Sequence, residues 1–380
     1  MTQASEIEKT RIRSTTRIQS LVRQFESLGI DTMLVTDELN VHYLTGFTGD
    51  SSVLWVRPQE TVLLSDGRYT AQIAKECPGL EVSIRAPEVR MPDFINAVVG
   101  SDSKQRIGYE ANHLTVALFN DLQDASDANW ISTTGVIESL RMIKDEHEIA
   151  ILRRAVAIAE DAFLDVGLCP GSPPSLDVSL TEMELAYALE AAMRRHGASG
   201  CSFDPIVAVD AAGALPHYRP GPTPIAGAKS LLIDWGAKVN GYASDMTRTL
   251  HTSGVDDDFA HAYAACLAAQ EAAIAAIKPG VAAQDIDAAA RNVLTDAGYG
   301  DAFKHALGHG VGLFIHEAPR MGGKIETPLQ AGMVVTVEPG IYLDNRFGIR
   351  IEDDVLITTG GHEVLGGRIP KGLDEMRGIG

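Results

Sequence analysis

The stretch Leu231–Leu250, LLIDWGAKVNGYASDMTRTL, places two carboxylates inside segments made of buried-type residues. An apolar run from Leu231 to Ile233 leads directly into Asp234, and Asp245 follows eleven residues later inside a second strand-like run. Burying a carboxylate costs free energy unless a positive group compensates its charge. The sequence therefore requires a source of positive charge beside both acids.

A second part of the chain repeats this design. Val334–Glu338 is another apolar run closed by an acid, and a glycine-containing turn and a strand carrying Glu352 follow it. Two hairpins of one design predict a pseudo-symmetric αβ sandwich in which four carboxylates converge between the halves.

The alternation of side chains along a strand predicts which residues lie beside Asp245 and Glu352. Residues two apart on a strand point to the same side. In the predicted strand Gly241–Leu250, Asp245 therefore shares a face with threonines, and in Gly348–Ile357, Glu352 shares a face with Arg350.

Four carboxylates that converge in a protein interior repel one another. They coexist if they are protonated, if arginine or lysine side chains pair with them, or if they share bound cations. Three arginines are candidates for such pairing: Arg248, Arg320 and Arg350. From the acids alone, salt bridges and shared metal ions both remain open.

The segment His305–Arg320, HALGHGVGLFIHEAPR, adds an imidazole to this set. Gly308 and Gly310 flank His309, and glycine allows close backbone approach. One imidazole with four carboxylates suits two manganese or cobalt ions and can accept zinc. Two divalent ions about 3.5 Å apart form a hydrolytic centre, whereas a lone histidine in such a loop commonly has a structural role.

The composition excludes several classes of partner. The chain has 380 residues, which predicts two domains, and its formal net charge of -19 argues against a nucleic-acid groove or an anionic membrane surface. No apolar stretch reaches the length of a membrane span, and the polar N-terminus has no secretory signal. Four widely spaced cysteines without a CxxC pair indicate free thiols. We expect a cytoplasmic protein.

Strand-like and helix-like segments alternate in the first third of the chain, which predicts a compact α/β domain over residues 1–137. The expected strands are 31–37, 51–58, 60–69, 80–85, 106–110 and 130–133, and the expected helices 17–28, 70–77, 91–99 and 114–125. Residues 138–380 form the second predicted domain, where strand pairs interleave with amphipathic helical segments at 137–168, 180–198, 258–280 and 282–300.

Four motifs in order resemble a known family. DWGAKVNGYASDMTRT (234–249), GHGVGLFIHEAP (308–319), TVEPGIY (336–342) and GIRIEDD (348–354) are similar to the pita-bread metallopeptidases, within them to the Xaa-Pro aminopeptidase and prolidase branch. NVHYLTGFTGDSS (40–52), LLSDGRYTAQ (63–72) and ESLRMIKDEHEI (138–149) resemble that branch's creatinase-type N-terminal domain and the start of its catalytic domain. The resemblance covers nearly the whole chain and implies a creatinase-like α/β domain followed by a pita-bread catalytic domain.

Carried over residue by residue, the resemblance implies two divalent metal ions and five ligands: Asp234, Asp245, His309, Glu338 and Glu352. Manganese is the expected ion, with cobalt and zinc as alternatives. The resemblance also makes Asp245 and Glu352 the bridging ligands and gives Glu338 a second role in proton transfer.

The same resemblance assigns residues beside the metals. His217, in ALPHYRP, and His316 would contact the substrate and the developing oxyanion. Arg350 would order the acids and touch the substrate, and Tyr342 matches a family tyrosine near the metals and is a candidate substrate contact; for both, support by hydrogen bonding alone is the competing interpretation. The chain departs from the usual pattern at Leu307, where threonine is common, and at Trp235, where phenylalanine is frequent. Asn40, Tyr43, Arg68 and Tyr69 are candidates for a substrate-limiting rim, with ordinary domain packing as the competing interpretation.

The implied activity is hydrolysis of the Xaa-Pro bond at the N-terminus of short proline-containing peptides, as an Xaa-Pro aminopeptidase. The alternative is an Xaa-Pro dipeptidase (prolidase). Methionine aminopeptidase shares the catalytic core but lacks the large N-terminal domain, and a creatinase-like metal-free hydrolase loses the ligand acids. A metal-free binding module of the same fold would have little use for the acid cluster. The family resemblance also implies a homodimer.

Overall fold

The computed structural model describes residues 3–100, 104–171, 175–252 and 254–378 of the chain. Internal contacts divide the chain into two compact units, Met1–Arg141 and Met142–Gly380. The division falls at the end of helix α7 (Val136–Arg141), whereas the predicted boundary at residues 137/138 lies inside this helix.

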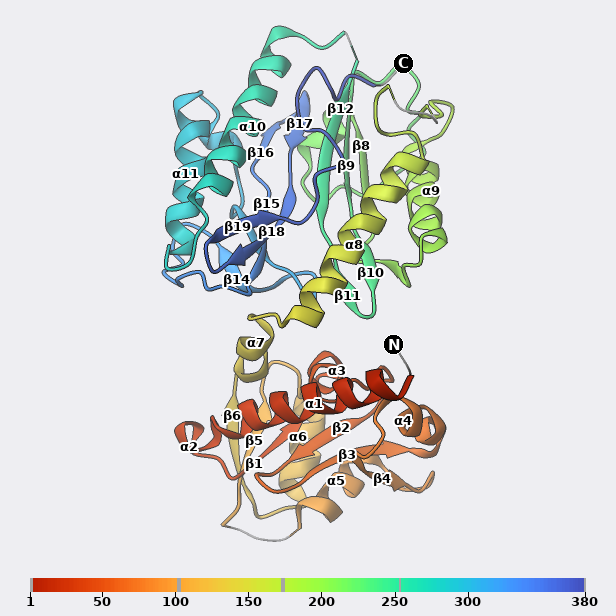
Figure 1. Cartoon of the computed structure of the whole chain (residues 1–380), viewed down its shortest axis with the longest axis vertical. Helices are drawn as coiled ribbons and strands as arrows, with labels where there is room; N and C mark the ends of the chain where they lie inside the picture. The colour runs from red at the N-terminus through yellow and green to blue at the C-terminus, as the bar shows by residue number, and fades with distance from the viewer. Residues whose placement is uncertain (1–2, 101–103, 172–174, 253, 379–380) are drawn as a thin grey trace. The chain divides into compact units, whose positions relative to one another are not determined.

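A six-stranded mixed sheet forms the centre of the first unit (Figure 1). Its order is β4-β3-β2-β1-β5-β6, with β1 (Thr32–Val35), β2 (Val53–Val56), β3 (Thr61–Asp66), β4 (Glu81–Arg85), β5 (Arg106–Glu110) and β6 (Asn129–Thr133). Strand β1 pairs antiparallel with β2 and parallel with β5. All six predicted strands are confirmed. Trp55, Leu34 and Ile107 are fully buried in its core.

Helices flank this sheet, and one of them was missed by the sequence prediction. The helices are α1 (Gln3–Val22), α2 (Phe25–Leu28), α3 (Glu38–Thr45), α4 (Thr70–Glu76), α5 (Met91–Val99), α6 (Val116–Asp124) and α7. The helix expected at 17–28 is the end of a longer α1 followed by α2. Helix α3 was not predicted, although Asp37 caps it by accepting a hydrogen bond from the Leu39 amide at 3.1 Å.

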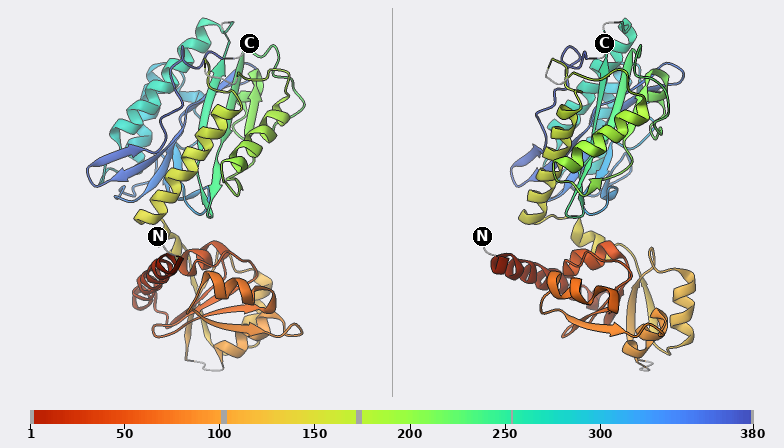
Figure 2. Two further views of the ribbon diagram at one scale, coloured as in Figure 1. Left: turned by 45° about the vertical axis from the view of Figure 1, so that its right-hand side comes forward. Right: turned by 90° about the vertical axis from the view of Figure 1, so that its right-hand side faces the viewer.

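The second unit consists of two halves, each with strands and a pair of helices (Figure 2). The first half contains α8 (Glu146–Asp165), α9 (Glu182–Arg195), β7 (Gly200–Cys201), β8 (Ile206–Val209), β9 (Ser230–Trp235), β10 (Ala237–Val239), β11 (Tyr242–Ala243) and β12 (Met246–His251). The sheet orders are β12-β9-β8 and β11-β10-β7.

The second half repeats this arrangement with its own helix pair, α10 (Asp257–Ala276) and α11 (Ala283–Asp296). Its strands are β13 (Gly308–Gly310), β14 (Glu317–Met321), β15 (Val334–Val337), β16 (Gly340–Leu343), β17 (Phe347–Arg350), β18 (Asp353–Thr358) and β19 (Gly361–Val364). They form a sheet of order β14-β13-β15-β18-β19 and the hairpin β16-β17. The strands lie between the two helix pairs (Figure 1).

Helix capping explains where the second unit's first helices begin. The segment predicted as helical at 137–168 is interrupted, because Asp145 and Glu148 form a capping box that starts α8. Thr181 and Glu184 form the same box at the start of α9.

Among the described residues, no helix is both long and apolar enough to cross a bilayer.

The two acid-bearing strands are each broken, which corrects the prediction of continuous strands at Gly241–Leu250 and Gly348–Ile357. The first splits into β11 and β12 around Asp245, and the second into β17 and β18 around Glu352. The backbone amide of Asp245 donates to the side chain of Asp354 at 3.1 Å instead of to a neighbouring strand. Equivalent breaks in both halves agree with the predicted pseudo-symmetry.

Candidate metal centre

A cavity of about 1110 Å³ lies within the second unit. Its lining includes all five predicted metal ligands together with three of the predicted substrate-side residues: Asp234, Asp245, His217, His309, His316, Glu338, Arg350 and Glu352. These residues come from strands of both halves and from the loops between them. The structure therefore brings together side chains that are up to 135 residues apart in the sequence.

The four predicted acidic ligands stand at the ends of strands or at the breaks between them. Asp234 lies on β9, and Glu338 directly follows β15. Across the two halves, the amide of Glu352 donates to the carbonyl oxygen of Thr247 at 3.1 Å, and the Thr247 hydroxyl donates to the Glu352 carboxylate at 2.6 Å. This link between β12 and the β17–β18 break fixes the position of Glu352.

His309 presents one ring nitrogen to the acids. Its Nδ1 lies 3.0 Å from the carbonyl oxygen of Gly310, so Nδ1 carries the proton and Nε2 has a free lone pair. Nε2 lies 3.3 Å from Glu338 Oε1 and 3.6 Å from Asp245 Oδ2. Burial lowers the pKa of His309 to about 4, which keeps the ring neutral and able to bind a cation.

Close packing around His309 requires a glycine on its N-terminal side. A Cβ atom at Gly308 would lie 2.2 Å from the carbonyl oxygen of Thr336. The Thr336 hydroxyl accepts from the His309 amide at 3.0 Å and donates to Glu338 at 3.1 Å. The histidine and the glutamate are thus held by the same threonine.

The electrostatics of the bare site are unfavourable to four ionised carboxylates. Burial and repulsion from Glu352 and Asp234 raise the pKa of Asp245 well above its usual range, and burial with repulsion from Glu338 does the same for Glu352. Burial raises the pKa of Glu338 to about 8. Such a group of acids requires added positive charge to ionise together at neutral pH.

Arginine pairing supplies only part of this charge. Arg350 Nη2 donates to Asp234 Oδ2 at 2.6 Å. Arg248 instead binds Asp353, at 2.7 Å. Within the described residues, no ion pair joins Arg320 to the cavity acids, although this side chain lines the cavity. Arg350 therefore pairs closely with Asp234 and more weakly, at 3.9 Å, with Glu352, and among the described residues no arginine or lysine pairs with Asp245 or Glu338.

The residues fit a cation centre. Asp234 Oδ1 and Asp245 Oδ1 are buried and have no hydrogen-bond partner among the described residues. Ligand atoms of Asp245, His309 and Glu352 lie within 4.8 Å of one another. Buried oxygens that lack donors and stand beside a neutral imidazole form the donor set of a divalent ion.

A comparable group in the first unit is different. Ligand atoms of Asp37, His113 and Glu138 also lie within 4.8 Å of one another. Here His113 is exposed and both acids are only half-buried, whereas Asp245 and Glu352 are buried, so water can solvate the first-unit carboxylates and they have less need of a bound cation. We assign the metal centre to the second unit.

Tyr342 lies behind Arg350 and is absent from the described residues that line the cavity, which fits the supporting role that the sequence left open. Its side chain is 1 % exposed. Arg350 Nη1 donates to the Tyr342 hydroxyl at 2.9 Å, and this hydroxyl lies 2.9 Å from His305 Nε2. Tyr342 therefore orients Arg350, and through it Asp234.

His217 and His316 lie on the cavity wall. His217 is exposed, and the His316 ring centroid is 4.4 Å from that of His309. Burial and the charge of His217 lower the pKa of His316. Two imidazoles on the wall beside the acids are suited to donate hydrogen bonds to a substrate carbonyl.

The two departures from the usual family pattern lie in the protein interior. Leu307 is fully buried, and its carbonyl oxygen accepts from the Glu338 amide at 2.9 Å. Trp235 stacks on Phe163 with ring centroids 4.6 Å apart and donates to the Ala159 carbonyl at 2.9 Å. Neither side chain touches the cavity, so both substitutions act through packing.

Two supporting residues, Thr336 and Asp354, were not predicted from the sequence, whereas the period of two had already placed Thr247 on the strand face of Asp245. Thr336 lies two residues before Glu338, and the same period could have placed it on that ligand's strand face. Asp354 follows Glu352 by two residues, yet nothing in the sequence shows that it accepts the Asp245 amide.

The first-unit residues predicted for a rim divide into two kinds. Asn40 is buried and donates to Glu110 at 2.6 Å, and Tyr43 is 5 % exposed. Both serve packing within the first unit. Arg68 is exposed and Tyr69 is half-buried on its surface.

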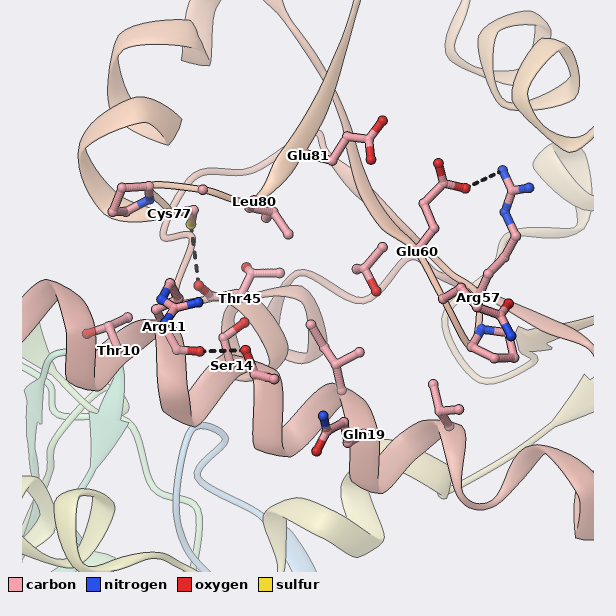
Figure 3. A pocket seen from close by; sticks show the side chains of 18 of the residues that line it. Thr10, Arg11, Ser14, Gln19, Thr45, Arg57, Glu60, Cys77, Leu80 and Glu81 are labelled. Atoms are coloured by element: carbon pink, nitrogen blue, oxygen red, sulfur yellow. Dashed lines mark hydrogen bonds and ion pairs between the residues drawn. The ribbon is translucent and has the colours of Figure 1, made fainter.

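A second cavity, of about 600 Å³, lies within the first unit between α1, β3 and the turn before β4 (Figure 3). Arg57 pairs with Glu60 at 3.0 Å along its edge. Cys77 donates to the Thr45 carbonyl at 3.4 Å, and burial raises the pKa of this thiol to about 12. A protonated thiol and paired charges give no reason to assign chemistry to this cavity.

A buried, oxygen-rich centre with one imidazole, set between two similar αβ halves, defines a metal-dependent hydrolase of the pita-bread class. The chain belongs to metallopeptidase family M24, whose sequence profile matches residues 150–359. The profile of the creatinase/prolidase N-terminal domain matches residues 17–143. The predicted family, fold class and peptidase activity are confirmed, and the family's dependence on two metal ions agrees with the centre described above.

Solved structures and curated sequences extend this result. An Xaa-Pro dipeptidase from Bacillus anthracis is 36% identical with a TM-score of 0.88, covering 95% of this chain and 99% of that one. An X-Pro aminopeptidase from Thermotoga maritima is 33% identical with a TM-score of 0.82, covering 92% and 99%. An uncharacterized peptidase of Bacillus subtilis is 36% identical over 92% of this chain and 97% of its own length. The fold is that of Xaa-Pro peptidases and prolidases.

Proposed function

We propose that the protein is a dinuclear metal-dependent exopeptidase that hydrolyses the Xaa-Pro bond at the N-terminus of short peptides. The observation that carries this proposal is the cavity in which Asp234, Asp245, His309, Glu338 and Glu352 meet two substrate-side histidines. Structures with the same fold are described as an Xaa-Pro dipeptidase and an X-Pro aminopeptidase, which supports proline specificity.

The residues have separable roles in this reaction. Divalent ions held by the four carboxylates and His309 would supply an activated water and polarise the scissile carbonyl. His217 and His316 donate hydrogen bonds to the carbonyl oxygen as negative charge develops there. Glu338, whose pKa burial raises to about 8 in the bare site, moves a proton towards the leaving nitrogen.

The cavity size favours the aminopeptidase over the dipeptidase. A volume of about 1110 Å³ exceeds the 300–1,000 Å³ typical of small-ligand sites. It leaves room for residues that follow the proline. The dipeptidase alternative is supported by the similarity to the Bacillus anthracis enzyme.

Two further proposals follow from the residue content and a third from the family resemblance. Manganese is the proposed ion, because four carboxylates and one imidazole favour a hard cation over thiophilic metals. A cytoplasmic location fits the four free cysteines. A homodimer remains a prediction from the family resemblance.

A single assay tests the activity. Purified protein is treated with a chelator, resupplied with manganese, and given Ala-Pro and Ala-Pro-Ala in parallel. Manganese-dependent release of alanine from both peptides, faster from the tripeptide, supports the aminopeptidase; release from Ala-Pro alone supports the dipeptidase. Failure to cleave either peptide while Ala-Ala-Ala is hydrolysed would contradict proline specificity.

A further inference from the structure

A buried ion pair lies beside the metal centre but outside its ligand set. Lys144 Nζ lies 2.9 Å from Glu317 Oε1, with side chains 0 % and 6 % exposed. Lys144 precedes α8, and Glu317 is the first residue of β14 and directly follows His316. A buried ion pair is weak evidence for stability, because desolvation offsets most of the attraction. The main effect of the pair is therefore expected on the position of the loop that carries His316.

Each partner of the pair has a further hydrogen bond, Lys144 to the turn before β15 and Glu317 within the loop that carries His316. The Lys144 amide donates to the Gly332 carbonyl at 2.8 Å, which fixes the lysine backbone to the turn before β15. The second oxygen of Glu317 accepts from the Phe314 amide at 3.4 Å. The Glu317 side chain thus bonds within the short loop 314–317, and Lys144 pairs with it from a segment outside this loop.

The space for this pair depends on Gly312. A Cβ atom at Gly312 would lie 2.1 Å from Glu317 Oε1 and 3.2 Å from Lys144 Cε. The Gly312 carbonyl also accepts from the Ala243 amide at 2.8 Å. Because Ala243 lies two residues before Asp245, the loop that carries His316 is connected to the strand that leads to a metal ligand.

We propose that the Lys144–Glu317 ion pair is a positioning device that fixes the loop carrying His316 over the metal centre and thereby sets the rate of peptide hydrolysis. Neither residue needs to touch the reacting atoms for this effect. A misplacement of about 1 Å in a catalytic group costs about 10²-fold in rate. The inference rests on the proposed function in one respect, namely that His316 contacts the substrate.

The test uses the full chain loaded with manganese and three variants. Lys144→Met removes the positive charge beside the buried carboxylate of Glu317, and the double variant Lys144→Met/Glu317→Gln removes both charges while keeping similar side-chain lengths. The matched control is Arg194→Met, which breaks the exposed pair Arg194–Glu190 on α9. Turnover of Ala-Pro-Ala, bound manganese and thermal unfolding are measured for each.

We expect the single variant to unfold at a lower temperature and the double variant to recover stability. Both should retain two manganese ions, and both should show kcat reduced about tenfold or more with little change in KM. The control should change kcat less than twofold. Recovery of kcat together with stability in the double variant would overturn the proposal, because it would make the pair's role purely structural.

A double-mutant cycle shows whether the pair acts through His316. Adding the double variant to His316→Ala should reduce kcat no further than His316→Ala alone, since interactions that act through one group are not additive. Independent, multiplicative losses would overturn the assignment to His316.

Hydrogen exchange provides a readout without substrate. In Lys144→Met/Glu317→Gln, amides of residues 312–318 should exchange faster, while those of β9 and β15 remain unchanged. Unchanged exchange in 312–318 would refute the positioning role even if peptide hydrolysis is confirmed. Conversely, faster exchange in a protein that hydrolyses no Xaa-Pro peptide would support the positioning role of the ion pair and contradict the proposed function. The two failures are therefore distinguishable.

Discussion

At the scale of single residues, the site is defined by charges that are unfavourable without a ligand. Asp245 is 4 % exposed, is surrounded by other acids, and has one oxygen with no hydrogen-bond partner in the part of the chain that the structure describes. His309 faces it with an unprotonated nitrogen because its other nitrogen bonds to the Gly310 carbonyl. These features explain why the residue types recognisable in the sequence are required together.

Replacing Asp245 by asparagine should separate metal binding from folding. The metal-free variant should be at least as stable as the wild type, because a repelled buried carboxylate is removed. Turnover should fall about 10²-fold or more, since even outer-shell changes at metal sites cost 10–100-fold. Thermal unfolding with and without manganese, together with peptide assays, checks both parts. Asp204→Asn, at an exposed position on the cavity rim, is the control, and a variant that keeps wild-type turnover would contradict the ligand assignment.

Replacing His316 by alanine should leave metal binding intact. The ring borders His309 but lies on the cavity wall, so its loss removes a donor to the substrate and no proposed ligand. We expect kcat to fall about 10²–10³-fold while metal analysis still finds two manganese ions. Loss of manganese in this variant would show that His316 belongs to the ligand set.

At the scale of the elements, breaks in strands determine where the acids point. Period two correctly grouped Glu352 with Arg350, whose Nε lies 3.9 Å from Glu352 Oε2. It also predicted unbroken strands, which is wrong, because the chain changes sheet at each acid. The break depends on Asp354 accepting the Asp245 amide, a contact between residues 109 positions apart that no local pattern contains.

Replacing Thr247 by valine should weaken the connection between the halves. The hydroxyl donates to Glu352 at 2.6 Å and accepts from Arg350 Nε at 2.9 Å. Its loss leaves buried polar groups unsatisfied and should cost about 1–3 kcal/mol in the free energy of unfolding. Urea denaturation measures the change, and Thr247→Ser, which retains the hydroxyl, should stay within about 1 kcal/mol of the wild type. Equal stability of the valine variant and the wild type would show that this connection contributes nothing.

At the scale of the whole molecule, the metal centre belongs to one of two compact units. All five proposed ligands lie in Met142–Gly380, while the first unit has its own six-stranded sheet and buried core. Ligand binding stabilises only the unit that it contacts. The two units should therefore respond differently to metal removal.

Manganese at 100 times its dissociation constant should stabilise the second unit by about 2.7 kcal/mol. Hydrogen exchange measured with chelator and with manganese should show added protection in β9 and β15 and none in β1. Calorimetry should show the same contrast as an upward shift of one transition. Equal stabilisation of β1 would indicate that the two units unfold as one, and no stabilisation of β9 would argue against a metal centre.

The sequence by itself determined the family, the alternation of the first unit, and the identity of the acids and histidines. Local sequence patterns specify these properties: apolar runs ending in acids, glycines beside His309, and capping residues. The tertiary structure decided how the acids are compensated, pairing Arg350 with Asp234 but Arg248 with Asp353. It also decided that Arg350 donates hydrogen bonds both to the Tyr342 hydroxyl and to Asp234. The physical reason is that charge pairing and burial depend on distances between remote segments, which are set only when the two halves pack together.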